Sequence, residues 1–416
     1  MTTKMTKQND PVPGIERDST VRSWASSIQQ LWNRAYLRFT QGELGPWPIL
    51  IGLVVIWLFF QSQDQHFLMA RNLSNLVLQI GVVGTLAMGV VLVLLVGEID
   101  LSLGAVSGVC AGVLGVLVTT NHWNSWIAIV CTVLVGVAIG LLQGGVTVYI
   151  GIPSFIVTLA GLLAWEGVQL ILLGDVGELQ VQDNLIEKIS SSYLTPTLSL
   201  GLVGLAIVIY AINLWMRRAS RRRAGLEFLT IRALVIRVVI LAVVLIALVE
   251  FLNAYFGVPT ILVILLVLAV ALTLLTTMTI FGRYIYAIGG NAEAARRAGI
   301  RVSTVRIAVF ALTSAIAAFG GVISVSRAFA VSTGTGGGTL LLDAIAAAVI
   351  GGTSLFGGRG QIYQALLGAL VIGSVQNGLD LLGQPSSTKD IATGIILVIA
   401  VSIDAISRRR RQAKGV

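Results

Sequence analysis

Long apolar segments are the feature that most constrains how this chain of 416 residues can fold. Hydrophobic residues make up 56% of it and charged residues only 11%, whereas a soluble globular domain carries about 25% charged residues. A soluble fold of this length needs more polar surface than these residues supply. Segments of about 20 apolar residues are long enough to cross a bilayer as helices. The sequence therefore predicts an all-α, polytopic membrane protein embedded in a lipid bilayer.

Twelve apolar segments qualify as candidate spans. The tenth is the weakest, because it is short and leads into a glycine-rich stretch. The expected spans are 47–61, 73–96, 102–119, 126–149, 154–173, 197–216, 233–252, 259–281, 305–326, 340–355, 362–382 and 390–406.

The distribution of Lys and Arg predicts the orientation. Twelve spans place 24 of the 28 basic residues on one side of the membrane. The four on the other side are Arg71, Lys188, Arg327 and Lys389. Because cytoplasmic loops carry the excess of positive charge, we expect both termini in the cytoplasm. The same rule explains the net charge of +9 without a nucleic-acid partner.

The chain divides into three expected parts. Residues 1–46 form a polar arm in which Trp24, Ile28 and Leu31 recur at helical spacing, as in a helix lying on the membrane surface; an arm without regular structure is the alternative. Residues 47–406 form the transmembrane domain, and 407–416 a basic cytoplasmic tail.

The loops and motifs limit what this chain can do alone. Its longest internal loop, at 282–304, is shorter than the roughly 50 residues that an independent domain needs. No Walker-type or GxSxG motif occurs, and the isolated histidines and the two cysteines within apolar segments do not indicate a metal site or a disulfide. We therefore expect no catalytic residue, metal or cofactor on this chain, and any energy source other than an ion gradient on a separate chain.

The first polar interruption is GEIDLSLG at 97–104, between the second and third spans. Its Glu98 and Asp100 either line a polar vestibule or belong to a structural turn. Asp100 and Ser102 are both suited to accept N–H groups at the start of the following helix.

The second interruption is the turn GIPSF at 151–155, where Pro153 suits a helix start. Together with Ser154 and Phe155 it marks either a tight connection or a broken helix beside a cavity. In the span that follows, Glu166 is an intramembrane acid, and such residues face protein or water. It is therefore a candidate for lining a pathway or tethering helices.

Two further interruptions lie towards the C-terminus. In the loop at 282–306, Asn291 is a good N-cap, Glu293 favours a helix start and Gly299 suits a helix end. A helix of two turns is unstable alone, so it must pack against span ends or a docked partner. The other stretch runs from Asp343 through the glycines to Gly360, and these glycines permit a sharp reversal.

These segments resemble the membrane permeases of bacterial ABC importers for monosaccharides, the ribose and xylose type. The matching strings occur in the family's order, and the chain is similar in its greater length to the xylose-type members. An insertion around 200–256 adds two spans to the usual ten. The strings are GEIDLSLG at 97–104, GIPSFIVTLAG at 151–161, GRYIYAIGGNAEAARRAGI at 282–300 and LDAIAAAVIGGTSLFGGRG at 342–360.

The resemblance implies a helix that couples the spans to a separate ATPase chain. It also implies two permease copies, ATP and Mg on the ATPase, an extracytoplasmic monosaccharide-binding protein and a bacterial cytoplasmic membrane. The expected coupling residues are Asn291, Glu293, Ala294, Ala295, Arg296, Arg297 and Gly299. The candidate pathway residues are Glu98, Asp100, Ser102, Pro153, Ser154, Phe155, Glu166 and Asp343.

Other functions stay open at this point. An ion-coupled transporter would use Glu98, Asp100 and Glu166 as a relay, but it leaves the short coupling-like helix unexplained. A related ABC permease would carry branched-chain amino acids or nucleosides. A scaffold or receptor subunit would move no substrate at all. Among monosaccharides the resemblance favours D-xylose.

Overall fold

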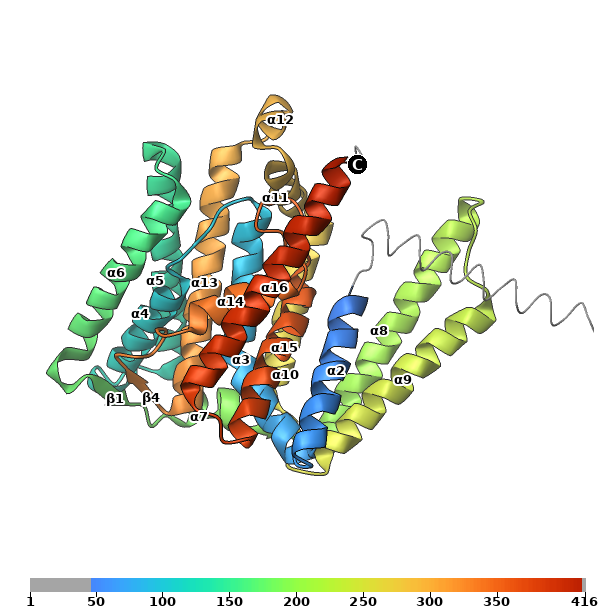
Figure 1. The fold of residues 1–416 in the computed structure, drawn as a ribbon, viewed down its shortest axis with the longest axis horizontal. Helices are drawn as coiled ribbons and strands as arrows, with labels where there is room; N and C mark the ends of the chain where they lie inside the picture. The colour runs from blue at the N-terminus through green and yellow to red at the C-terminus, as the bar shows by residue number, and fades with distance from the viewer. Residues whose placement is uncertain (1–45, 414–416) are drawn as a thin grey trace, which may run out of the picture. The chain divides into compact units, whose positions relative to one another are not determined.

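A computed structural model describes residues 46–413. Residues 49–405 form one compact unit; the surface helix expected within 1–46 lies outside the described residues. The unit is built almost entirely of helices, with two pairs of short strands (Figure 1). The prediction of an all-α membrane protein is confirmed.

Nine helices in the described part of the chain are long and apolar enough to cross a membrane. Two of them, α4 and α5, continue into short π-helical turns at Val116–Thr120 and Val146–Ile150. The nine are α3 (Ala70–Leu95), α4 (Leu103–Gly115), α5 (Ser125–Gly145), α6 (Ser154–Leu173), α8 (Pro196–Arg223), α9 (Ile231–Asn253), α10 (Thr260–Met278), α13 (Val302–Ala328) and α15 (Ile362–Leu381).

The other expected spans differ from this pattern. The first corresponds to the shorter α2 (Trp47–Gln63), and the last lies within α16 (Ser386–Ala413). The tenth, expected at 340–355, is helical only in α14 (Leu340–Ile350). Its C-terminal part is wrong as a helix, because the chain turns at Gly352 and Gly357 with φ of +84° and +90°, which glycine adopts readily.

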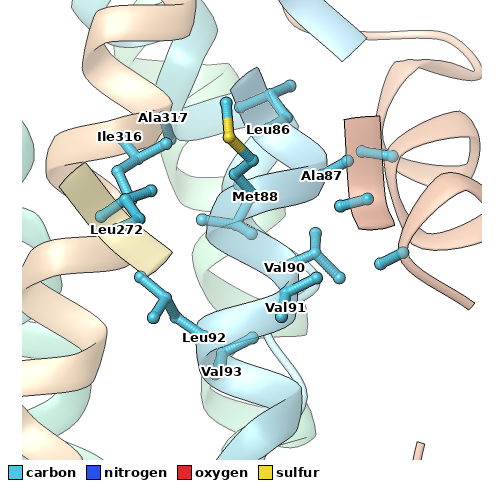
Figure 2. Close-up of a cluster of buried hydrophobic side chains, with 14 of the residues drawn as sticks. Leu86, Ala87, Met88, Val90, Val91, Leu92, Val93, Leu272, Ile316 and Ala317 are labelled. Atoms are coloured by element: carbon cyan, nitrogen blue, oxygen red, sulfur yellow. The ribbon is translucent and has the colours of Figure 1, made fainter. Parts of the chain in front are cut away.

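Helix α3 lies in the middle of the unit and packs against α10, α13, α14 and α15. From Leu86 to Leu95 all its side chains are buried, and Figure 2 shows this stretch against Leu272 of α10 and Ile316 and Ala317 of α13. A helix that is apolar on all sides is typical of a membrane span, and in α3 these apolar faces are covered by the neighbouring helices.

Helices α5 and α13 approach each other through small residues. A methyl group at Gly140 would lie 2.4 Å from the carbonyl oxygen of Phe310, and one at Gly136 would lie 2.6 Å from Cβ of Ala318. The Gly-x₃-Gly spacing at 136, 140 and 144 predicts such close packing in lipid, where small residues let helix backbones meet.

Helices α8 and α9 form a hairpin that packs mainly on itself. Most of its apolar side chains are exposed, in contrast to those of α3. At its outer end, β2 (Tyr193–Leu194) pairs with β3 (Val258–Pro259).

The remaining elements gather at the two ends of the unit. Helix α7 (Asn184–Ser191) and the paired strands β1 (Glu178–Gln180) and β4 (Ala330–Ser332) lie at one end. The short helices α11 (Ile280–Gly290) and α12 (Ala292–Arg297) lie at the other (Figure 1). From the distribution of Lys and Arg we expect the α12 end to face the cytoplasm, and the two ends are named cytoplasmic and external on that expectation.

Candidate functional site

An ion pair joins the α3–α4 turn to the first turns of α13. Oε1 of Glu98 lies 2.9 Å from Nε of Arg306, and the two side chains are 11% and 30% exposed. A carboxylate this buried is stable only when it is paired. Glu98 therefore fastens the turn to the helix that follows α12, close to the cytoplasmic surface.

Asp100 holds the start of α4 from a buried position. Its Oδ1 accepts the backbone N–H of Ser102 at 2.8 Å and the Ser102 hydroxyl at 2.6 Å. Burial raises the pKa of this carboxyl to about 6, and the bonds from Ser102 oppose the shift. Ser102 itself makes no capping bond to the helix; its Oγ accepts an N–H of Gln143 at 3.0 Å. Neither of the two expected caps accepts an N–H group of α4, because Asp100 bonds only to Ser102, the residue before the helix.

The α5–α6 turn lies directly against the α3–α4 turn. Ser154 Oγ accepts the backbone N–H of Ile99 at 3.3 Å, and Thr158 Oγ1 accepts that of Leu101 at 3.0 Å. These two turns and the loop carrying α12 line one cytoplasmic pocket of about 250 Å³. Its lining includes Glu98, Pro153, Ser154, Arg296, Ser303 and Arg306.

Helix α12 is short and anchored on one side. Asn291 Oδ1 accepts the backbone N–H of Ala294 at 2.9 Å, and Gly299 turns the chain with a φ of +87°. Ala295 is buried against the core, whereas the outward face carries Glu293, which pairs with Arg296 and Arg297. The helix thus presents charged side chains outward from a fixed base.

The glycine loop after α14 packs against the end of α3 and the C-terminal end of α11, which leads directly into α12 and is called the base of α12 below. The N–H of Gly358 donates to the carbonyl of Leu95 at 3.0 Å, and the hydroxyl of Tyr286 donates to the carbonyl of Gly360 at 2.8 Å. A methyl group at Gly289 would lie 1.8 Å from the Leu95 carbonyl oxygen and 2.5 Å from the Gly358 nitrogen. The first three polar interruptions and the glycine loop of the fourth therefore meet at this end of the bundle.

Three candidate pathway residues lie elsewhere. Phe155 and Glu166 are exposed on the outer face of α6. Asp343 is buried in the first turn of α14, where its Oδ2 accepts the Thr339 hydroxyl at 3.1 Å. The structure thus does not bring these three together with Glu98 and Asp100. Within 46–413, no group of three His, Cys, Asp or Glu side chains is placed to hold a metal ion.

A second pocket lies at the opposite, external end and was missed by the sequence reasoning. It has a volume of about 540 Å³ and lies between α3, α7, α13 and α15. Its polar lining consists of Asn72, Asn75, Gln79, Ser190, Ser191, Tyr193, Ser326, Arg327, Asn377 and Asp380. The available signal was spacing, because positions 72, 75 and 79 fall on one face of a helix.

An amide network orders this external pocket. Nδ2 of Asn72 donates to Oδ1 of Asn377 at 2.7 Å, and Nδ2 of Asn377 donates to Oε1 of Gln79 at 3.2 Å. Arg327 lies beside it and reaches the backbone carbonyl of Gln79 at 3.5 Å. Asp380 is held by Lys389 at 2.6 Å. The pocket offers fixed donors and acceptors but little net charge, which suits a neutral polar ligand.

Comparison with known proteins decides the class. Residues 72–401 match the family described as "Branched-chain amino acid transport system / permease component". The chain belongs to this family. The match covers both pockets and the α12 loop, so both ends of the bundle described above are parts of a permease.

Curated relatives extend along most of the permease. The xylose transport system permease protein XylH of Escherichia coli K12 is 37% identical over 87% of this chain and 92% of its own length. XylH of Haemophilus influenzae is 36% identical over 87% and 96%. The ribose import permease protein RbsC of Bacillus subtilis is 29% identical over 91% and 97%. No solved structure matches the chain.

Proposed function

We propose that this permease forms the membrane pathway of an ATP-driven importer for a pentose such as D-xylose, in a bacterial cytoplasmic membrane. The external pocket carries the proposal, since its amide and hydroxyl groups suit an uncharged polyol. The relatives named for xylose and ribose support the same class of substrate. A related cargo, a branched-chain amino acid or a nucleoside, is the competing substrate class within the family.

In this proposal an extracytoplasmic binding protein releases the sugar into the external pocket. Asn72 and Asn377 exchange their mutual hydrogen bond for bonds to sugar hydroxyls. Tyr193 and Phe329, which also line the pocket, cover the apolar faces of the ring. Fixed polar groups with apolar walls are the usual composition of a small-molecule site, and a neutral sugar requires no buried counter-charge.

Movement is driven from the cytoplasmic end. The exposed Glu293, Arg296 and Arg297 of α12 dock on a separate ATPase chain, which supplies ATP and Mg. The base of α12 touches the α3–α4 turn and the glycine loop through backbone contacts. When the ATPase pair closes, α12 moves and displaces the α3–α4 turn and the glycine loop together. This displacement shifts the position of the central helix α3.

The permease acts as a homodimer through the outer face of α6. Leu163 and Ile171 on this face are 67% and 81% exposed, and Glu166 is exposed between them. A carboxylate facing lipid is costly, whereas one covered by a second copy finds polar partners. In a two-fold interface only residues near the symmetry axis meet their own counterpart, and the proposal places Leu163 there, with Glu166 facing other polar groups of the second copy. Leu163→Cys, with Cys110 and Cys131 replaced by Ala, should form a dimer-linking disulfide; Leu205→Cys on the exposed face of α8 should not.

The direct test is uptake by proteoliposomes containing the permease, its ATPase and its binding protein. We expect uptake of labelled D-xylose that depends on ATP and not on an ion gradient. Unlabelled ribose should compete more than leucine or a nucleoside. Uptake driven by a proton or sodium gradient without ATP would contradict the proposal.

Variants separate the pocket from general effects. Asn72→Ala or Asn377→Ala should lower uptake about tenfold or more, because each removes a hydrogen bond and leaves a buried partner unpaired. Asn121→Ala is the matched control, since this exposed amide lies at the same end of the bundle but outside the pocket. Equal uptake by all three variants would remove the pocket from the pathway.

A further inference from the structure

The cytoplasmic half of the α8–α9 hairpin concentrates positive charge. Residues 213–237 contain seven arginines and a single acid, Glu227. Among the ion pairs formed by described residues, none includes any of these arginines. The orientation rule accounts for basic residues in the connecting loop, but it does not explain why some are drawn into the helices.

Arg217 and Arg237 lie inside the helices and line the same pocket. Arg217 is six residues before the end of α8 and Arg237 six residues after the start of α9, so each lies about 9 Å from its helix end. The pocket between the two helices has a volume of about 660 Å³ and is also lined by Arg218, Ser220 and Arg221. Like charges gathered at this depth repel one another unless an anion joins them.

A second pocket shares Arg218 with the first. It has a volume of about 470 Å³ and is lined by Trp215, Arg222, Arg223 and Ile231 besides Arg218. The guanidinium of Arg218 lies 5.2 Å from the ring centre of Phe228, and its Nη1 is buried without a hydrogen-bond partner. This guanidinium nitrogen is therefore available to donate to a ligand that brings an acceptor oxygen into the pocket.

The surroundings of these pockets identify the class of ligand. Trp215 and Met216 are 58% and 54% exposed, and Phe228 is 44% exposed, so apolar side chains flank the arginines. Guanidinium groups bind phosphate oxygens in pairs, with matched geometry. A soluble phosphate compound would use the arginines and leave the apolar flank uncovered, whereas a phospholipid uses both.

We propose that the α8–α9 hairpin binds the headgroup of an anionic phospholipid of the cytoplasmic leaflet. One phosphate lies between Arg217, Arg218 and Arg237, and the acyl chains run along the exposed apolar face of the hairpin. The adjoining pocket around Arg222 and Arg223 accepts a second phosphate, so a lipid with two phosphates, diphosphatidylglycerol, binds more tightly than phosphatidylglycerol. Basic pockets between helices at this membrane level have the properties that anionic headgroups require.

Lipid titration of the purified full-length permease, followed by native mass spectrometry, tests the proposal. The probes are diphosphatidylglycerol, phosphatidylglycerol, phosphatidylcholine and inorganic phosphate. We expect binding in that order, with phosphatidylcholine and inorganic phosphate weak. Replacing Arg217 and Arg237 by Gln should weaken diphosphatidylglycerol binding about 30-fold, from the loss of two charges near the membrane surface.

The matched control replaces two exposed arginines outside both pockets, Arg232 and Arg283, by Gln. This pair should weaken binding less than threefold. Equal weakening in the two pairs, equal binding of phosphatidylcholine, or displacement of the lipid by inorganic phosphate would overturn the proposal. If the first pair cannot be purified, Arg217→Lys keeps the charge but loses the two-point contact; unchanged lipid affinity in this variant would overturn the proposal as well.

Discussion

Neutralising Glu98 tests whether the α3–α4 turn is fastened to α13 by charge. In Glu98→Gln the carboxylate that pairs with Arg306 is lost while the shape of the side chain is kept. Arg306 then remains partly buried, at 30% exposure, without its ion-pair partner. We expect lower stability and weaker coupling of ATP hydrolysis to uptake, because the turn is no longer held to the helix that follows α12.

The magnitude follows from distance and burial. At an effective dielectric constant of about 20, unit charges 4 Å apart attract by about 4 kcal/mol. Removing both groups from water offsets part of this, so the coupling energy should be about 2 kcal/mol. The exposed pair of Glu293 and Arg297 is similar in length, at 3.1 Å, but its side chains are 57% and 80% exposed. Its coupling should stay below about 0.5 kcal/mol.

A double-mutant cycle measures both pairs in the same protein. Glu98→Gln, Arg306→Gln and the double variant are unfolded by denaturant in detergent, and the Glu293–Arg297 pair is treated likewise. We expect the coupling energy of the Glu98–Arg306 pair to exceed that of the Glu293–Arg297 pair about fourfold. The coupling energy of the buried pair should also decrease less at 0.5 M salt. Equal coupling energies would refute the reasoning, since burial would then contribute nothing. Unchanged uptake in Glu98→Gln would show that the turn has no part in coupling.

Three further predictions concern packing, titration and coupling. Gly140→Ala should destabilise the permease by about 1–3 kcal/mol because α5 must separate from α13, whereas Gly145→Ala on the same helix, with its nearest atom 4.0 Å away, should be neutral or slightly stabilising in the same denaturation assay. The pKa of Asp100 is raised from 3.8 to about 6, so between these values the folded state holds a proton that the unfolded state has lost, and the free energy of unfolding should fall by on the order of 3 kcal/mol as pH rises from about 4 to 6 and then level off. The difference in unfolding free energy between wild type and Asp100→Asn, measured against pH, tests this, and the same pH dependence in both proteins would contradict it. Gly299→Leu should uncouple ATP hydrolysis from uptake, since a φ of +87° disfavours a branched side chain there, and the ratio of sugar transported to ATP hydrolysed checks it.

The sequence predicts the membrane class and most spans because hydropathy alone determines them. It is less informative where one helix is interrupted. The segment at 340–355 is apolar enough to continue as a helix. A Cβ atom at Gly351 would lie only 2.6 Å from the carbonyl oxygen of Gln364, so close packing against α15 determines where α14 stops. Such a tertiary contact leaves no periodic signal in the sequence.

The candidate sites divide in the same way. The four interruptions were recognisable because glycine, proline and charge break an apolar pattern, and the structure places them together. The external pocket was missed because Asn72 and Gln79 lie within or beside apolar runs, and their partner Asn377 is some 300 residues away. Glu166 is the opposite case. An acid within an apolar span is easily recognised in the sequence, but only the fold reveals that its side chain faces outward.

The close packing of Gly289, just before α12, has a consequence for which ATPase chain this permease would recognise. There is no room for a side chain at position 289, because it would clash with Leu95 and Gly358. This end of α11 therefore tolerates almost no substitution. The outer face of α12, in contrast, carries Glu293, Arg296 and Arg297 in solvent, where replacements cost little stability. If α12 docks on an ATPase chain as proposed, recognition of a different ATPase can be engineered or acquired by changing this outer face alone, with the packing of Gly289 against Leu95 and Gly358 left intact.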